Sequence, residues 1–121
     1  MKKILLIGLD PETVDYSKWP DLSPEKLHAT LENDKNKLND LGYDAELFFI
    51  DNPNTIIVKL AKLLLSKEYN CILIGAGVRK DNDNMLLFEK LINAIHKSAP
   101  SANICFNSNP YDTADAVKRW V

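Results

Sequence analysis

The segment from Gly75 to Arg79, which reads Gly-Ala-Gly-Val-Arg, contains residue types that could bind a small anion. It directly follows an apolar run that begins at Cys71. Glycines allow backbone amides to approach a ligand closely, and an arginine can pair with a carboxylate or phosphate through two parallel hydrogen bonds. The segment therefore predicts an anion site, with tight backbone geometry at a strand end as the alternative role for the glycines.

A second candidate region is the segment from Asp10 to Leu22, which follows the first apolar run and contains Tyr16 and Trp19. Connections from a strand to the next helix typically take about 2 to 6 residues, so this one is long. A long connection with two aromatic side chains is typical of a lid or a contact surface. The alternative is an irregular loop whose aromatic rings pack over the end of the sheet.

Polar side chains also stand at the ends of the other apolar runs. Asp51 follows the second run, and Asn107 follows the fourth. His28 is expected in the first turn of a helix, facing the same crevice. Such residues often only cap helices and form turns, and His28 could equally be a surface side chain. The ligand-binding residues that we predict are Asp10, His28, Gly75, Gly77, Arg79 and Asn107.

Common catalytic and cofactor motifs are missing from the sequence. There is no Gly-x-Ser-x-Gly, no His-Glu-x-x-His and no Cys-His arrangement, and the glycines lack the third member of a dinucleotide fingerprint and the Gly-Lys-Ser/Thr of a P-loop. Cys71 and Cys105 lie in apolar runs without metal-ligand spacing, which favours buried reduced thiols. We therefore expect no cofactor and no metal ion.

Alternating elements must position these residues. Four short apolar runs alternate with four helix-like segments, which predicts βαβ units and a parallel sheet. The predicted strands are Lys3 to Leu9, Ala45 to Ile50, Cys71 to Gly75 and Asn103 to Phe106. Runs one and three are continuously apolar, as central strands are, whereas runs two and four carry polar residues. With right-handed crossovers this favours the order 2-1-3-4, a small doubly wound α/β fold that is flavodoxin-like in outline.

Capping residues indicate where the helices begin. Ser23 followed by Pro24 predicts the start of the first helix, and Gly42 its end. Asn52-Pro53 gives the same signal for the second helix. The third helix is expected to begin near Asp83, and the last helix at Asp112 or Thr113.

Length, composition and charge limit the class of protein. The chain has 121 residues with 45% hydrophobic content, which suits a single α/β domain over residues 1–121. Its 15 basic and 17 acidic residues give a formal net charge of -2, which gives no electrostatic reason to bind nucleic acid or an anionic membrane. The first apolar run ends too early for a signal peptide, so we expect a cytoplasmic protein.

Several stretches together resemble a known family. They read Ile-Leu-Leu-Ile-Gly-Leu-Asp-Pro-Glu at 4–12, Ile-Gly-Ala-Gly-Val-Arg at 74–79, Phe-Glu-Lys-Leu-Ile-Asn-Ala-Ile-His at 88–96 and Ile-Cys-Phe-Asn-Ser-Asn-Pro at 104–110. This combination is similar to a family of small uncharacterised bacterial α/β proteins. The resemblance implies a bacterial, cytoplasmic, single-domain protein and assigns no activity or catalytic residue. Receiver domains are similar only in outline, because glycines stand where their phosphoacceptor aspartate belongs.

Three hypotheses about function follow. The leading one is a domain that binds or senses a small anionic or polar ligand at the carboxyl edge of strands one and three. The second is a small hydrolase or transferase with His28 as general base and Asp10 to orient it, which requires the two side chains within hydrogen-bond reach. The third is a protein-interaction module. An uncharged edge at strand four also makes a homodimer possible in this interpretation.

Overall fold

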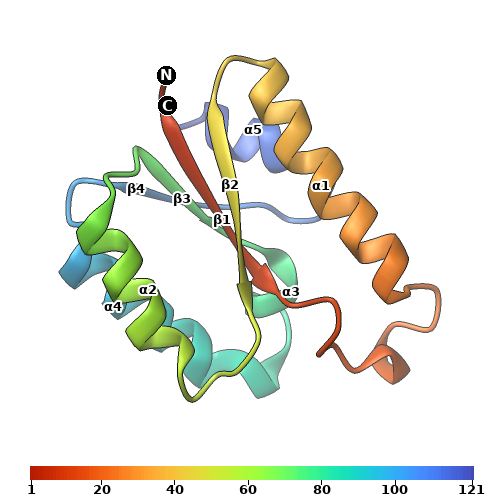
Figure 1. Cartoon of the computed structure of the whole chain (residues 1–121). Helices are drawn as coiled ribbons and strands as arrows, with labels where there is room; N and C mark the ends of the chain where they lie inside the picture. Colours follow the sequence, from red (N-terminus) through yellow and green to blue (C-terminus); the bar gives the residue numbers. More distant parts are fainter.

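A four-stranded parallel sheet in the order β2-β1-β3-β4 forms the centre of the computed structural model, which describes residues 1–121 (Figure 1). Its strands are β1 (Lys3–Leu9), β2 (Asp44–Ile50), β3 (Cys71–Ile74) and β4 (Asn103–Phe106). The α/β class, the parallel direction and the strand order confirm the prediction. The observed outline is that of a flavodoxin-like sheet.

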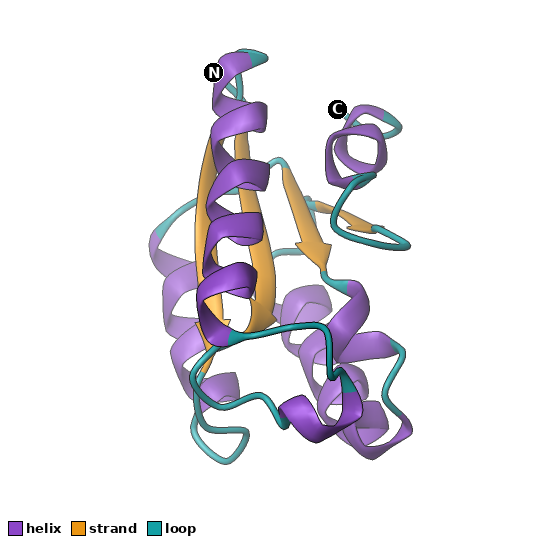
Figure 2. Ribbon diagram, turned by 90° about the vertical axis from the view of Figure 1, so that its right-hand side faces the viewer, coloured by secondary structure: helices purple, strands orange, loops and turns teal.

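Helices cover both faces of this sheet (Figures 1 and 2). On one face lie α2 (Ile56–Ser66) and α4 (Met85–Ser98), and on the other lie α1 (Pro24–Asp40) and α5 (Thr113–Lys118). Successive strand residues point to opposite faces. Leu5 and Ile7 therefore join the core under α2 and α4, whereas Ile4 and Leu6 join the core under α1 and α5.

The core under α1 and α5 is the smaller of the two, with 10 buried residues against 14. Leu38 is the one buried residue of α1, although the helix has 17 residues. Leu31 and Leu27, on the same apolar stripe about two and three turns nearer the N-terminus, are only half-buried. The N-terminal half of α1 thus packs less closely on the sheet than the C-terminal half, which leaves space between the two.

The predicted capping residues of α1 take up their expected roles. The Ser23 side chain accepts a hydrogen bond from the Lys26 amide, and Gly42 has a φ of 96°, a conformation that favours glycine. For α2 the predicted start is three residues early. Asn52 accepts the Asn54 amide in a turn, and the helix begins only at Ile56.

Two short helices were not predicted. The segment expected to leave β3 as a loop forms α3 (Ala76–Arg79), and the long connection after β1 contains the 3-10 helix η1 (Tyr16–Lys18). A second 3-10 helix, η2 (Asn82–Asn84), leads into α4. Four residues give too little periodicity to reveal a helix in a sequence, and the two glycines of the segment favour a loop prediction.

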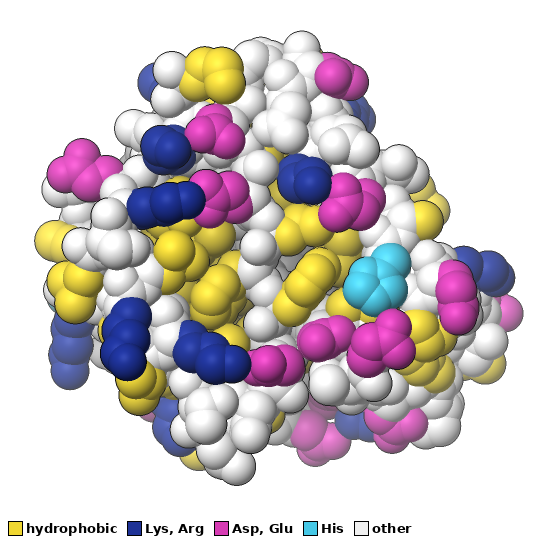
Figure 3. Space-filling view, in the orientation of Figure 1, with side chains coloured by type: hydrophobic (Ala, Val, Ile, Leu, Met, Phe, Trp, Pro, Cys, Tyr) yellow, Lys and Arg dark blue, Asp and Glu magenta, His cyan; other side chains and the backbone are white.

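Charges of both signs occur on the face of the molecule shown in Figure 3. Hydrophobic side chains lie across the middle of this face, and acidic and basic side chains are interspersed around them (Figure 3). None of the helices combines the length and apolar character that crossing a bilayer requires.

Candidate functional site

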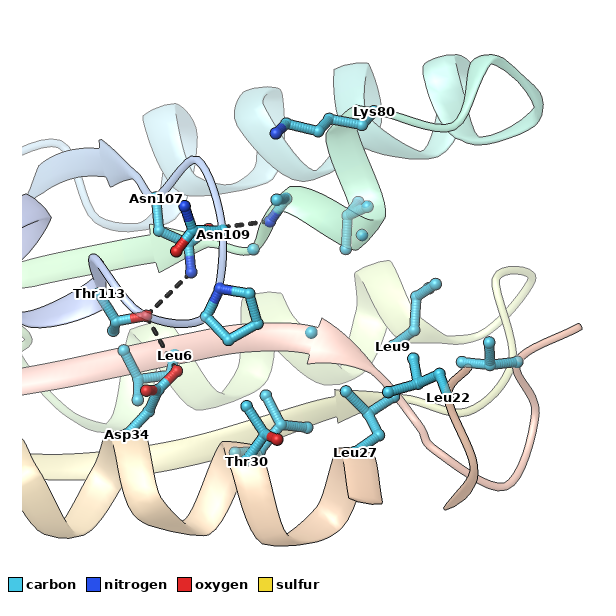
Figure 4. A pocket seen from close by; sticks show the side chains of 18 of the residues that line it. Leu6, Leu9, Leu22, Leu27, Thr30, Asp34, Lys80, Asn107, Asn109 and Thr113 are labelled. Atoms are coloured by element: carbon cyan, nitrogen blue, oxygen red, sulfur yellow. Dashed lines mark hydrogen bonds between the residues drawn. The ribbon is translucent and has the colours of Figure 1, made fainter. Parts of the chain in front are cut away.

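A cavity of about 570 Å³ lies beside the carboxyl ends of β1 and β3, on the face that α1 and α5 cover (Figure 4). The N-terminal half of α1 and Asp34 form one wall, and the connection from β4 to α5 forms the opposite wall. The connection from β1 to α1 borders it as well. This is the space left where the N-terminal half of α1 stands away from the sheet.

Gly8 forms part of the floor of the cavity. It lies two residues after Leu6 in β1, so a side chain at this position would point to the same face as Leu6, toward α1. A Cβ atom built at Gly8 would meet no atom within 4 Å. Phe49, its neighbour on β2, also lines the cavity. A glycine inside a strand often marks a place where a ligand or another backbone approaches closely.

The two predicted glycines after β3 border the same cavity but differ from each other. A Cβ atom at Gly75 would lie 3.3 Å from the backbone oxygen of Ile7, so the close packing of β3 against β1 favours glycine there. A Cβ atom at Gly77 would meet no atom within 4 Å. Gly75 thus has the structural role that was the alternative, and Gly77 leaves open space.

Most of the cavity wall is apolar. Leu27 and Leu31 of α1 face Leu73 of the sheet across it, and Trp19 borders it from the β1–α1 connection. The helical spacing of the α1 leucines places them on the stripe that faces the sheet. They are only half-buried, and the surface they present is available to an apolar ligand.

A chain of hydrogen bonds closes the inner end of the cavity (Figure 4). The Ala76 amide donates to Asn107 Oδ1 at 2.9 Å, and Asn107 Nδ2 donates to Thr113 Oγ1 at 2.9 Å. Thr113 Oγ1 in turn donates to Asp34 Oδ2 at 2.9 Å. A backbone amide can only donate, so Ala76 fixes the orientation of the Asn107 side-chain amide, and each later donor follows from it. Asn107 is thus a buried side chain that shapes the cavity.

Asp34 is the acidic member of this chain, and sequence reasoning missed it. Burial raises the pKa of its carboxyl group, while the hydrogen bond from Thr113 opposes that rise. The sequence does contain a signal, because Asp34 lies three residues after Leu31 and four before Leu38, on the apolar stripe of α1. A carboxylate on the stripe that faces the core is unusual, and here it faces the cavity.

Arg79 lies outside the lining of the cavity, and the prediction that its guanidinium faces the crevice is wrong. Its Nε donates to the carbonyl oxygen of Ile74 at 3.1 Å, and Nη2 donates to the carbonyl oxygen of Asn107. The guanidinium carbon also lies 5.0 Å from the centre of the Phe106 ring. Because the segment turns into α3, the side chain is carried round to the ends of β3 and β4, which it joins.

Asp10 and His28 do not come together. Asp10 Oδ1 accepts the Glu12 amide at 3.0 Å, and His28 Nε2 lies 3.2 Å from Glu12 Oε1. The His28 ring also packs edge-on against Phe49, with 6.0 Å between ring centres. Neither Asp10 nor His28 lines the cavity. The hydrogen-bonded pair that the hydrolase or transferase hypothesis requires is therefore absent.

The β1–α1 connection is held in place beside the cavity by two kinds of bond. The Tyr16 hydroxyl donates to the carbonyl oxygen of Pro11 at 2.6 Å, within the connection itself. Lys18 Nζ lies 3.0 Å from an Asp81 oxygen and 2.8 Å from an Asp83 oxygen, on the segment around η2. Of the two aromatic residues predicted to form a lid, Trp19 borders the cavity and Tyr16 braces the connection.

No protein-family model matches the chain, and neither does any curated protein. We therefore infer the function from the geometry of the cavity.

Proposed function

We propose that this chain binds a small organic molecule in the cavity beside β1 and β3, as a ligand-binding or ligand-sensing domain. The observation that carries the proposal is Gly8, which leaves open space in a strand whose positions from Ile4 to Ile7 and at Leu9 carry apolar side chains. A volume of about 570 Å³ lies within the usual range for small-molecule sites, which is about 300 to 1,000 Å³. Apolar walls with a few convergent polar groups are also typical of such sites.

The class of ligand differs from the anion first expected. Arg79, the main reason to expect an anion, is engaged by carbonyl oxygens and by Phe106. The polar groups at the inner end of the cavity are Asn107, Thr113 and Asp34. Amide, hydroxyl and carboxylate groups beside apolar walls favour a ligand with an apolar body and a polar end.

The test is a thermal-shift screen of small metabolites, compared between the wild type and a series at Gly8. A ligand at about one hundred times its Kd stabilises the folded state by about 2.7 kcal/mol, which raises Tm by roughly 10 °C for a chain of this size. We expect Gly8→Leu to fill the cavity and abolish that rise. Gly8→Ala adds only a methyl group and is expected to reduce the rise in part.

The Gly8 series also carries its own folding control. Adding a side chain in open space within a strand is expected to raise the stability of the unliganded protein by about 0.5 to 1 kcal/mol for Gly8→Ala. A variant with a higher free energy of unfolding and a smaller ligand-induced thermal shift has lost binding because the cavity is filled, and not because the protein is destabilised. Equal thermal shifts in wild type and Gly8→Leu would show that the ligand binds elsewhere, and the proposal would fail.

The finer expectations about origin and assembly stand as proposals. The resemblance over residues 4–12 and 104–110 supports a bacterial, cytoplasmic protein, and two buried free thiols at Cys71 and Cys105 are compatible with a reducing compartment. The uncharged edge of β4 supports a homodimer, although its four-residue length works against pairing, and light scattering at micromolar concentration would test it.

A further inference from the structure

Asp34 is a half-buried carboxylate that forms no ion pair, although Lys37 on the same helix attracts it at longer range. None of the ion pairs in the structure includes it, and the Thr113 hydroxyl is its hydrogen-bond donor. Thr113 donates to Oδ2, and no protein group donates to Oδ1. Oδ1 is open to solvent, because no buried side-chain oxygen lacks a hydrogen-bond partner. A ligand that covers this oxygen must replace the lost water with a donor of its own. A free oxygen on the wall of an apolar cavity is therefore suited to an outside donor.

We propose that the cavity selects an apolar amine, whose ammonium group binds Oδ1 of Asp34 while its hydrocarbon body packs against the leucines of α1. This inference rests on the proposed function, because it names the ligand class of the same cavity. A charge-assisted hydrogen bond between an ammonium and a carboxylate is roughly twice as strong as one between neutral groups. An amine would thus supply the cation that the protein leaves out.

The basic residues around the cavity do not favour the opposite charge. Lys80 Nζ donates to the carbonyl oxygen of Ser108, and Figure 4 places Lys80 across the cavity from Asp34. Lys18 is paired with Asp81 and Asp83 on the segment around η2. Lys18 is therefore neutralised by carboxylates, whereas Lys80 keeps its charge but lies across the cavity from Asp34, held toward the Ser108 carbonyl. An anionic ligand bound at the inner end would thus meet the Asp34 carboxylate.

The experiment compares three probes that share one apolar body and differ in charge. They are naphthylethylamine, naphthylethanol and naphthylacetate, titrated into the wild-type protein and followed by calorimetry. We expect the amine to bind at least about tenfold more tightly than the alcohol, because hydrogen bonds to charged groups contribute about 1.5 to 3 kcal/mol. The acid should bind most weakly. This comparison needs no variant, so it does not depend on any variant folding.

Variants then assign the preference to one side chain. Asp34→Asn is expected to remove the preference for the amine and to leave alcohol binding within about twofold of wild type, because the cavity keeps its shape. Asp40→Asn is the matched control: it removes an exposed carboxylate from the same helix, away from the cavity, and should keep the preference. Thermal melts of both variants check folding.

The outcomes separate this inference from the proposed function. If the alcohol or the acid binds as tightly as the amine, or if Asp34→Asn keeps the amine preference, the inference is overturned. Binding of those probes that Gly8→Leu abolishes would still support a small-molecule cavity. If Gly8→Leu binds every probe as the wild type does, the cavity itself is not the site and both proposals fail.

Discussion

Asn107 Oδ1 accepts the backbone amide of Ala76 at 2.9 Å, and this bond joins the end of β4 to the first residue of α3. The bond crosses from one predicted site segment to the other. Its two residues are 31 positions apart in the sequence. Because Asn107 also donates to Thr113, one side chain sets the positions of α3, α5 and the inner end of the cavity.

Removing the Asn107 side chain is expected to destabilise the fold. Asn107→Ala leaves the Ala76 amide without its acceptor and removes the donor to Thr113 Oγ1, and an unsatisfied buried polar group costs about 1 to 3 kcal/mol. Urea unfolding would measure the loss. Asn93→Ala, an exposed asparagine on α4, is the control and should change the free energy of unfolding by less than about 0.5 kcal/mol. Equal effects at the two positions would contradict the assigned role of Asn107.

Arg79→Lys is expected to lower stability and leave ligand binding unchanged. Lysine cannot reproduce the two bonds to the carbonyl oxygens of Ile74 and Asn107 together with the contact to Phe106, so we expect a loss of about 1 to 2 kcal/mol in the free energy of unfolding. Denaturant unfolding and the ligand-induced thermal shift are both needed. If Arg79→Lys loses the ligand-induced thermal shift but keeps the stability of the wild type, the guanidinium belongs to the binding site after all.

The stability of the wild type and of Asp34→Asn should diverge with pH. Burial raises the pKa of Asp34 in the folded state, so the folded chain holds this proton more tightly than the unfolded chain does. Stability contributed by the group is therefore greatest at acidic pH and falls as the pH rises from the unfolded pKa through the folded pKa. Asparagine has no such proton.

We expect Asp34→Asn to be more stable than the wild type at neutral pH and to lose that advantage in acid. Urea unfolding across this pH range checks the sign. Asp40→Asn, which changes an exposed carboxylate on the same helix, again serves as the control. A variant that is less stable than the wild type at neutral pH would show that Asp34 serves folding rather than binding.

Alanine substitutions at two glycines should have opposite effects. Gly42 has a φ of 96°, which an alanine adopts only with strain, so Gly42→Ala is expected to lower the free energy of unfolding by about 1 kcal/mol. Gly77 lies inside α3 with open space around a Cβ atom, so Gly77→Ala should be neutral or stabilising by up to about 1 kcal/mol. Thermal melts of Gly42→Ala and Gly77→Ala measure the two effects. A larger loss of stability in Gly77→Ala than in Gly42→Ala would contradict the backbone argument.

The strands and their order were predictable because strands that are buried on both faces consist mainly of apolar residues. The continuously apolar runs from Lys3 to Leu9 and from Cys71 to Ile74 are the central strands β1 and β3, and the bounds of β1 and β4 were predicted to the residue. Hydrophobic periodicity depends on many residues at once, so no single misjudged position changes the result.

The site was predictable in location but not in its side chains. Gly75, Gly77 and Asn107 border the cavity, because the strand order alone brings the ends of β3 and β4 together. Arg79 was misplaced because the direction of its side chain depends on whether four residues form a helical turn. Gly8 and Asp34 were missed because each departs from a pattern that otherwise fits: one glycine in a strand and one acid on an apolar stripe.

The division of α1 into a packed half and a half that borders the cavity affects how the helix fluctuates. Around Leu38 the helix packs against the core, which protects its backbone amides. Around Leu27 and Leu31 the helix borders the cavity, so fewer side chains pack against it. Hydrogen exchange along α1 should therefore be graded, fast toward Ser23 and slow toward Asp40. A molecule that fills the cavity would level this gradient, so the first turns of α1 would report occupancy to whatever touches the outside of the helix.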